Sequence, residues 1–321
     1  MRFLGRLFSV VCVLSVLSAC SDKAESLPIV PYPQDVVIET GSFNALGAKV
    51  ISEGLADDET ALLDKFGQQI ASASGNKNSL SKIVFRRDDS LEKEAYRLEI
   101  GNCKAVAYSS SYNGTLYAVM TLMQLMPAGV YTGSYDEEAD WTIPCAKIND
   151  KPRFGYRGAL LDCSRHFFEA DEIKKFLDVM AMYKLNRFHW HLTDDHGWRV
   201  EIKKYPLLTE VGSIRNGTMI GWDARSNDGI KYGGYYTQEQ LRDIVAYAAE
   251  RGIEIVPEID LPAHIVSALT AYPHLGCTGG PYNLMTVWDI AKDVLCVGKD
   301  SSFEFLEDVL SEVCDIFPYE Y

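Results

Sequence analysis

The segment that decides the fold is HWHLTDDHGWR, from His189 to Arg199. The predicted strand from Arg187 to Leu192 leads directly into acids, an imidazole, an indole and a guanidinium. Such a change from apolar to polar side chains is typical of a parallel β-strand that ends at the active-site edge of a β/α barrel.

The sequence around this segment alternates between strand and helix patterns. Strands are expected over 156–161, 187–192 and 253–259, with helices over 171–183, 237–252 and 301–316. Asp171 is the expected N-cap of the first helix, and Thr-x-x-Gln (237–240) and Ser-x-x-Glu (301–304) form capping boxes for the others. The predicted fold class is α/β, the first three units of a (β/α)8 TIM-type barrel, because a complete barrel needs eight strands and roughly 250 residues. An open sheet of three parallel strands is the alternative.

The chain is expected to divide near residue 150. Before that point, short strand patterns over 82–85, 96–100 and 105–108 accompany helical patterns over 59–72 and 113–126. We therefore predict a small α/β N-terminal domain over 21–150 and the barrel portion over 151–321.

Residues 1–20 form a predicted export signal. Arg2 and Arg6 precede an apolar run, and Leu17-Ser18-Ala19-Cys20 ends it. This ending resembles a bacterial lipoprotein signal, which implies lipid on Cys20 and a place in the periplasm or outer membrane. An ordinary cleaved signal with an incidental cysteine is the alternative. Because an exported protein can oxidise its thiols, Cys277 and Cys296 are the predicted disulfide pair, bracketing a Gly-Gly-Pro loop.

The formal net charge is −14 at pH 7, and the chain has no run rich in Lys and Arg. A nucleic-acid partner is therefore not expected, and neither is binding to an anionic membrane face.

Polar side chains follow each predicted strand of the second domain. Chemistry in a barrel collects at the carboxyl ends of its strands, so these residues are read as one group: Asp162, Arg165 and His166; Thr193, Asp194, Asp195 and His196; and Glu258, Asp260 and His264.

Two chemistries fit such a group. Metal-assisted hydrolysis is suggested by His189-x-His191, which puts two imidazoles on one face of a strand, but no second ligand cluster follows, so packing roles and no metal are expected. Glycoside hydrolysis asks for carboxylic acids, donors for sugar hydroxyls and aromatic walls. Asp194 and Asp195 are adjacent on an extended backbone, so at most one should enter the pocket.

Three segments resemble glycoside hydrolase family 20, the β-N-acetylhexosaminidases. They are RGALLDCSRHFF (157–168), NRFHWHLTDDHGWRVEI (186–202) and VPEIDLPAH (256–264), in the family's order and spacing. The resemblance covers everything after residue 150, and the first domain is similar to the family's usual N-terminal domain.

The resemblance implies a retaining mechanism in which the substrate's own 2-acetamido oxygen attacks the anomeric carbon, with no cofactor. Arg165 matches the Arg that binds the 3- and 4-hydroxyls of the terminal sugar. Asp194 and His264 match an Asp-His pair that orients the acid, with Asp260 supporting the histidine, and Arg157 is interpreted as structural. The implied partners are N-acetylhexosamine-terminated oligosaccharides or glycoconjugates.

The sequence departs from the family pattern in three ways. His196 stands where Gln is common, and Ala263 stands where Gly is common. The family's His-x-Gly-Gly-Asp-Glu motif, which carries the acetamido-binding Asp and the acid Glu, is absent, and Glu320 lacks its context. The 321-residue chain by itself is therefore expected to be inactive and poorly folded, and a lipid-anchored carbohydrate-binding protein is an alternative.

Overall fold

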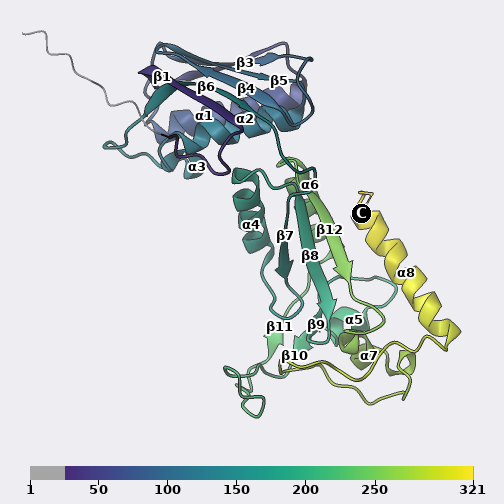
Figure 1. The fold of residues 1–321 in the computed structure, drawn as a ribbon. Helices are drawn as coiled ribbons and strands as arrows, with labels where there is room; N and C mark the ends of the chain where they lie inside the picture. The colour runs from purple at the N-terminus through teal and green to yellow at the C-terminus, as the bar shows by residue number, and fades with distance from the viewer. Residues whose placement is uncertain (1–25, 321) are drawn as a thin grey trace, which may run out of the picture.

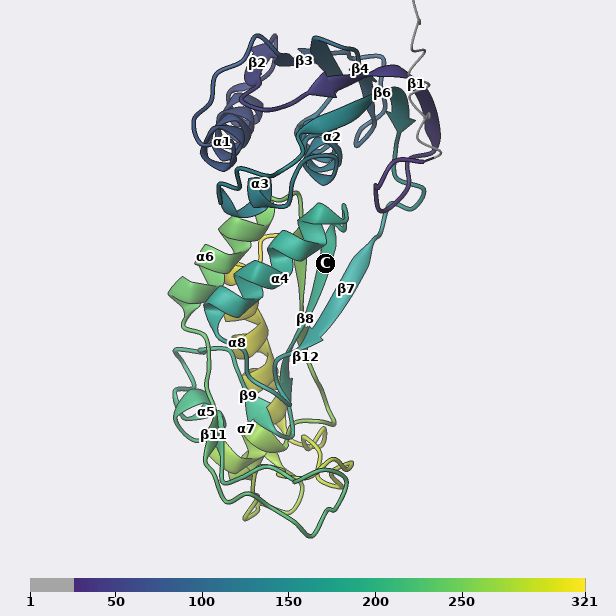
Figure 2. The ribbon, with the colours of Figure 1, turned by 90° about the vertical axis from the view of Figure 1, so that its left-hand side faces the viewer.

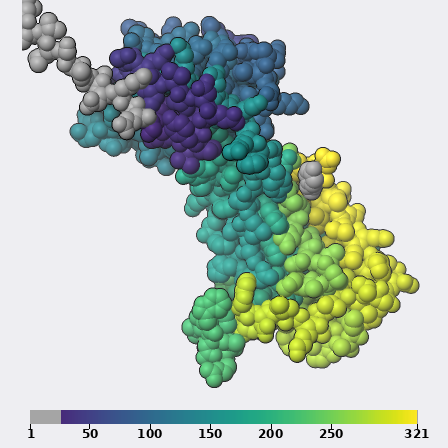
Figure 3. Space-filling model, viewed as in Figure 1, coloured from purple at the N-terminus to yellow at the C-terminus, as the bar shows by residue number. Residues whose placement is uncertain are grey.

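A computed structural model describes residues 26–320 of the chain (Figure 1). The predicted export signal and Cys20 lie outside the described residues. Within the described part, no helix is long and apolar enough to cross a membrane. The described residues form two lobes joined by a narrower region (Figure 3).

The first lobe is one mixed sheet covered on one face by helices. Its strands are paired in the order β1-β6-β4-β5-β3-β2, with β1 Asp35–Asn44, β2 Lys49–Glu53, β3 Lys82–Arg87, β4 Tyr96–Ile100, β5 Lys104–Ser109 and β6 Thr142–Asp150. Helices α1 (Asp57–Ala73), α2 (Tyr112–Gln124) and α3 (Gly129–Thr132) lie between this sheet and the second lobe (Figure 2). The three strands and two helices predicted here are present, whereas β1, β2 and β6 were not predicted.

The second lobe contains three parallel strands. They are β7 (Gly158–Asp162), β8 (Arg187–Asp194) and β12 (Glu254–Ile259), with β8 in the middle. Helices α4 (Ala170–Met182), α6 (Gln238–Ala249) and α8 (Asp300–Ile316) lie on one side of these strands (Figure 2). The predicted alternation of strands and helices is therefore present in this lobe.

Several short elements complete the second lobe near the carboxyl ends of the strands (Figure 1). They are β9 (Gly197–Trp198), α5 (Leu207–Glu210), β10 (Ile214–Arg215), β11 (Tyr232–Gly233), α7 (Val266–Ala271) and the 3-10 helix η1 (Pro273–Leu275).

Of the three predicted helix starts, one is confirmed and two are wrong. Thr237 caps α6: its Oγ1 accepts from the Gln240 amide, and its own amide donates to Gln240 Oε1. Helix α4 begins earlier than expected, since its capping box joins Glu169 and Glu172 rather than starting at Asp171. Helix α8 has Lys299 at its N-cap without a side-chain bond, because the helix continues through Ser301 to Asp300.

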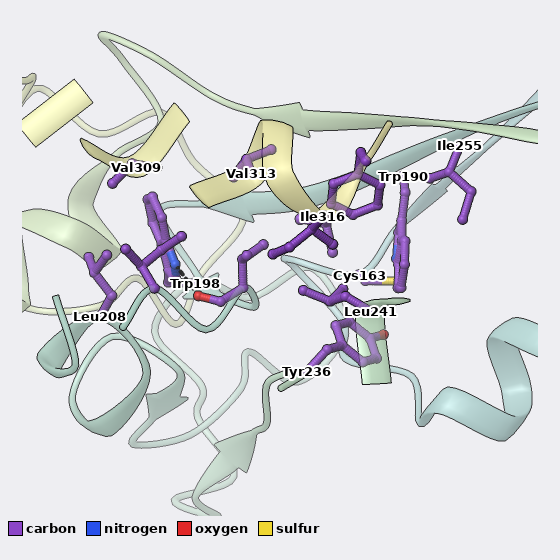
Figure 4. Close-up of a cluster of buried hydrophobic side chains, with 14 of the residues drawn as sticks. Cys163, Trp190, Trp198, Leu208, Tyr236, Leu241, Ile255, Val309, Val313 and Ile316 are labelled. Atoms are coloured by element: carbon purple, nitrogen blue, oxygen red, sulfur yellow. Dashed lines mark hydrogen bonds between the residues drawn. The ribbon is translucent and has the colours of Figure 1, made fainter. Parts of the chain in front are cut away.

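The core of the second lobe is built around two indoles from the opening motif (Figure 4). The Trp190 Nε1 donates to Cys163 Sγ at 3.1 Å, and Trp198 Nε1 donates to the Val200 carbonyl at 2.7 Å. Cys163 is fully buried, as expected of a small apolar residue. Helix α8 contributes Phe305, whose ring centroid lies 6.3 Å from that of Trp198.

Arg157 connects the two lobes. Its Nη2 donates to Glu94 Oε1 at 2.8 Å and to Tyr117 Oη at 2.6 Å, and its Nε donates to the Lys184 carbonyl at 2.7 Å. These contacts lie at the amino ends of the strands, away from the polar residues that follow them. The structural interpretation of Arg157 is confirmed.

Lys184 forms a second, buried connection between the lobes. Its Nζ donates to Tyr96 Oη at 2.9 Å and lies 3.3 Å from Asp150 Oδ2, and the residue is 4% exposed. Burial lowers the pKa of Lys184, against the opposing effect of the Asp150 charge. The pair is thus a desolvated charge contact at the domain junction.

The Lys184→Met variant should lose about 3 kcal/mol of unfolding free energy, because it leaves the Asp150 carboxylate buried without its cation. Urea or thermal unfolding at pH 7 measures this loss. Lys65→Met is the matched control, since Lys65 and Glu250 also join the two lobes at 3.0 Å but are 63% and 59% exposed. The control should lose less than about 1 kcal/mol, and equal losses in both variants would contradict the prediction.

Candidate active site at the carboxyl ends of the parallel strands

The polar residues that follow the three strands meet at one edge of the sheet. Strand β7 ends at Asp162, β8 ends at Asp194, and Asp260 directly follows β12. Because the three strands are parallel, their carboxyl ends lie together.

Asp194 lies at the centre of this group and has no solvent exposure. Its Oδ2 contacts Arg165 Nη2 and lies 3.2 Å from His191 Nε2. Its Oδ1 lies 3.2 Å from His264 Nδ1 and 3.9 Å from His196 Nδ1. Asp194 therefore contacts a residue after β7, a residue within β8 and a residue after β12.

The charge of this buried carboxylate is compensated by its neighbours. Burial alone would raise the pKa of Asp194, but the His191 and His196 imidazoles, the Asp195 amide and the Arg165 guanidinium outweigh burial and hold that pKa far below its ordinary value. Asp194 is therefore a fixed negative charge at neutral pH.

Arg165 is held between two carboxylates. Its Nη1 donates to Asp162 Oδ2 at 2.6 Å, its Nη2 contacts Asp194, and its backbone amide donates to Asp162 Oδ1 at 2.9 Å. A guanidinium has five N–H groups, so two contacts leave donors for other acceptors. The residue expected to bind sugar hydroxyls is thus preoriented.

His264 contacts both adjacent aspartates, which corrects the expectation that only one of them reaches the pocket. Its Nδ1 lies 3.2 Å from Asp194 Oδ1 and 3.2 Å from Asp195 Oδ2. Strand β8 ends at Asp194 and Asp195 begins a turn, so the alternation of an extended strand no longer applies. His264 has a φ of 51°, in the left-handed region that non-glycine residues seldom adopt.

Asp260 does not contact His264 as predicted. Its carboxylate is 4.0 Å from His191 Nε2, and its backbone amide donates to Thr193 Oγ1 at 3.0 Å. Burial raises the pKa of Asp260 despite the His191 charge, and the charges of Glu258 and Asp194 add to the effect. Asp260 therefore contacts His191 and Thr193 of β8, and not His264.

The two strand histidines share one carboxylate. Glu258 Oε2 lies 2.5 Å from His189 Nε2 and 3.1 Å from His191 Nδ1. His189 therefore has a hydrogen-bonding partner within the sheet, as expected for a packing residue, whereas His191 contacts the same carboxylate and its buried Nε2 makes no hydrogen bond within the described part of the chain. His166 does not join the cluster, because its ring stacks on Tyr232 at 4.8 Å.

Two groups of side chains have the spacing of metal ligands. One is His191, Asp194 and Asp260, and the other is Asp194, Asp195 and His264, each with ligand atoms within 4.8 Å of one another. Both groups use Asp194, whose carboxylate already faces the Arg165 guanidinium. A metal ion here would add a second cation beside that guanidinium, so the donor set fits an arginine better than a metal.

A loop far along the chain reaches this edge through backbone atoms, and the sequence analysis missed it. His196 Nε2 lies 2.9 Å from the Val287 carbonyl, and the Met285 amide donates to the Asp195 carbonyl at 3.1 Å. Trp288, which follows, has its ring centroid 5.2 Å from the Arg165 guanidinium carbon. The signal that could have found it is an aromatic residue in a loop after a polar strand end.

The ends of this loop carry the two cysteines of the predicted disulfide. Cys277 and Cys296 are free thiols in the structure, next to the bridge between Gly276 and Leu295. A hydrogen bond between the two thiols raises the pKa of Cys277 and lowers that of Cys296. The thiols are thus neighbours, and the disulfide stays a prediction.

Comparison with known proteins agrees with this geometry. Residues 154–321 match the model for the catalytic domain of glycosyl hydrolase family 20, and residues 26–151 match the model for domain 2 of the same family. The chain belongs to glycosyl hydrolase family 20. The resemblance found in the three sequence motifs is therefore confirmed.

The relatives that match the chain are named as hexosaminidases. The chain is 41% identical to a beta-hexosaminidase of Porphyromonas gingivalis, over 97% of the chain and 41% of the relative, and 35% identical to a beta-hexosaminidase of Vibrio furnissii, over 93% and 48%. The solved GH20 beta-N-acetylhexosaminidase of Streptomyces coelicolor is 32% identical with a TM-score of 0.81, over 92% of the chain and 58% of that structure. The chain spans less than half the length of these two curated relatives.

The pairing of His191 with acids should make stability depend on pH. Burial lowers the pKa of His191, but Asp194, Asp162 and Glu258 together raise it above its ordinary value near 6.5. A raised folded-state pKa stabilises the protein fully below pH 6.5, and the stabilisation is lost as pH rises through the folded pKa. The stability difference between wild type and His191→Gln should therefore narrow from pH 6 to pH 9.

Unfolding midpoints measured across that range test this expectation. His274→Gln serves as the control, because His274 is an exposed residue of η1, and its difference from wild type should stay constant. A pH-independent difference for His191→Gln would refute the assignment.

Proposed function

We propose that this chain is the first part of an exo-acting β-N-acetylhexosaminidase that removes terminal N-acetylhexosamine from glycans with retention of configuration. The observation that carries the proposal is the contact of Arg165 and His264 with the same buried carboxylate, Asp194. Family membership and the names of the relatives support it.

Each of these groups has a task in the proposed reaction. Arg165, fixed by Asp162 and Asp194, presents its remaining N–H donors to two neighbouring sugar hydroxyls. Asp194 and Asp195 accept from His264 Nδ1, which leaves Nε2 free to contact and orient a carboxylic acid. The substrate's acetamido oxygen then attacks the anomeric carbon while that acid protonates the leaving oxygen.

The acid and the acetamido-binding aspartate are proposed to come from the next strand of an eight-stranded barrel, of which β7, β8 and β12 are the first three. The three strands carry helices on one side only (Figure 2), and Leu160 in the middle of β7 is 52% exposed. An apolar side chain exposed within a strand is expected where a barrel interior remains to be filled. The partial lengths over which the relatives match fit the same reading.

Residues 21–321 alone should therefore not hydrolyse an aryl β-N-acetylglucosaminide, whereas a longer protein in which the remaining barrel strands follow Tyr321 should. In the longer protein, Arg165→Met should lower kcat/KM on the order of 100-fold, because two charge-assisted hydrogen bonds to the sugar are lost. Release of the aryl alcohol measures both.

Arg225→Met is the control for this experiment, since Arg225 is an exposed loop residue paired only with Asp223 among its described ion contacts. Its kcat/KM should equal that of wild type. Normal turnover by residues 21–321, or a longer protein that lacks turnover, would contradict the proposal, and sugar binding without turnover would indicate a carbohydrate-binding protein.

We also propose that the protein is exported and held at a bacterial membrane by lipid on Cys20, with Cys277 and Cys296 oxidised to a disulfide there. The supporting observations are the Leu-Ser-Ala-Cys sequence that ends the apolar run and the neighbouring thiols of the loop.

Wild-type protein should sediment with membranes and carry a diacylglyceryl group on Cys20, whereas Cys20→Ser should lack the lipid and lose the anchor. Membrane fractionation with mass spectrometry of the mature N-terminus gives the readout. Cys12→Ser, in the apolar run before Cys20, is the control and should behave as wild type. An unmodified mature N-terminus in the wild type would rule out the anchor.

A further inference from the structure

Trp288 is an exposed tryptophan beside a buried charge cluster. It is 63% exposed, and its ring centroid lies 5.2 Å from the guanidinium carbon of Arg165. That distance is within the range of a cation–π contact. The indole therefore contacts Arg165 on one side and leaves most of its apolar surface in water.

The backbone around Trp288 is hydrogen-bonded to residues of the cluster. The preceding carbonyl, that of Val287, lies 2.9 Å from His196 Nε2, and the Met285 amide donates to the Asp195 carbonyl. Both partners directly follow Asp194 in the chain. The position of the indole relative to Arg165 is thus set by the same segment that carries the buried carboxylate.

A second loop is hydrogen-bonded to the segment that carries Trp288. Residues 217–229 form a loop that projects from the lower end of the second lobe (Figure 3). The Met219 amide in this loop donates to the Thr286 carbonyl at 2.8 Å. Just before this loop, Arg215 Nη1 donates to the Arg165 carbonyl at 2.8 Å. Trp222 lies within the loop and is 88% exposed.

Exposed apolar surface next to convergent polar groups marks a ligand-binding position. The apolar ligand surface that fits a flat indole beside a hydroxyl-binding guanidinium is the C–H face of a pyranose ring. An indole buries a large apolar area at a small entropic cost, because it has only two side-chain torsions. The Trp288 indole can therefore supply an aromatic wall for a sugar beside Arg165.

We propose that Trp288 is a substrate-binding residue that stacks on the terminal pyranose whose hydroxyls Arg165 binds. This inference rests on the proposed function, since it assigns a contact within that same site. It places an aromatic wall on the loop between Cys277 and Cys296, on the Arg165 side of the sugar.

The test compares wild type, Trp288→Ala, Trp288→Phe and Trp222→Ala in the longer protein, with 4-nitrophenyl N-acetyl-β-glucosaminide and with chitobiose. Trp288→Ala should raise KM about tenfold on both substrates, equivalent to about 1.4 kcal/mol, with kcat retained. Trp288→Phe should recover most of the affinity because it keeps an aromatic face. Trp222→Ala is the control, because Trp222 is also an exposed tryptophan but has no described contact with Arg165. Its KM should match that of wild type.

A Trp288→Ala KM within twofold of wild type would overturn the inference, and so would an equal rise in Trp222→Ala or a rise confined to chitobiose. A wild-type protein without turnover would contradict the proposed function instead. In that case calorimetric titration with N-acetylglucosamine decides the Trp288 assignment, because Trp288→Ala should then raise Kd about tenfold and an unchanged Kd would refute it.

Discussion

The fully buried carboxylate of Asp194 is the constraint on which the strand edge depends. A charge without solvent is tolerated only if its surroundings compensate it. Arg165 reaches it from the turn after β7, His191 from β8 itself and His264 from the segment after β12. Three segments distant in sequence must therefore converge on one point, and this convergence places the groups proposed to bind and orient the substrate.

Arg199 is a second buried charge, and it holds together the loops that follow strands β7 and β8. It is fully buried, and burial lowers its pKa to about 10. Its guanidinium donates to four backbone carbonyls, those of Cys163, Ser164, Ser213 and Gly234. Each acceptor would cost free energy if left unpaired. The motif from His189 to Arg199 thus carries buried charges of both signs, and Asp194 and Arg199 each hold neighbouring segments together.

Sequence patterns predicted the features that repeat with a period, and missed those that depend on single contacts. The strand and helix order of the second lobe followed from apolar spacing, and the strand ends identified Asp194 and Arg165. The expectation for Asp195 was wrong because strand β8 ends at Asp194 and Asp195 lies in the turn that follows. Asp260 contacts His191 because β12, which it follows, pairs with β8. The 285–288 loop was missed because it reaches the site mainly through backbone atoms, which leave no pattern in the sequence.

The arrangement around Arg165 explains how an open edge can hold a preorganised guanidinium for the proposed sugar site. Asp162 and Asp194 fix the guanidinium from two directions, Arg215 holds its backbone carbonyl, and Trp288 covers one side of it. Ordering an arginine costs conformational entropy, and here folding bears that cost before any substrate arrives. The remaining donors are then available to the proposed sugar ligand without rearrangement of the side chain. Because these contacts come from the first three strands and their loops, recognition of the terminal sugar can be built separately from the acid that cleaves its bond.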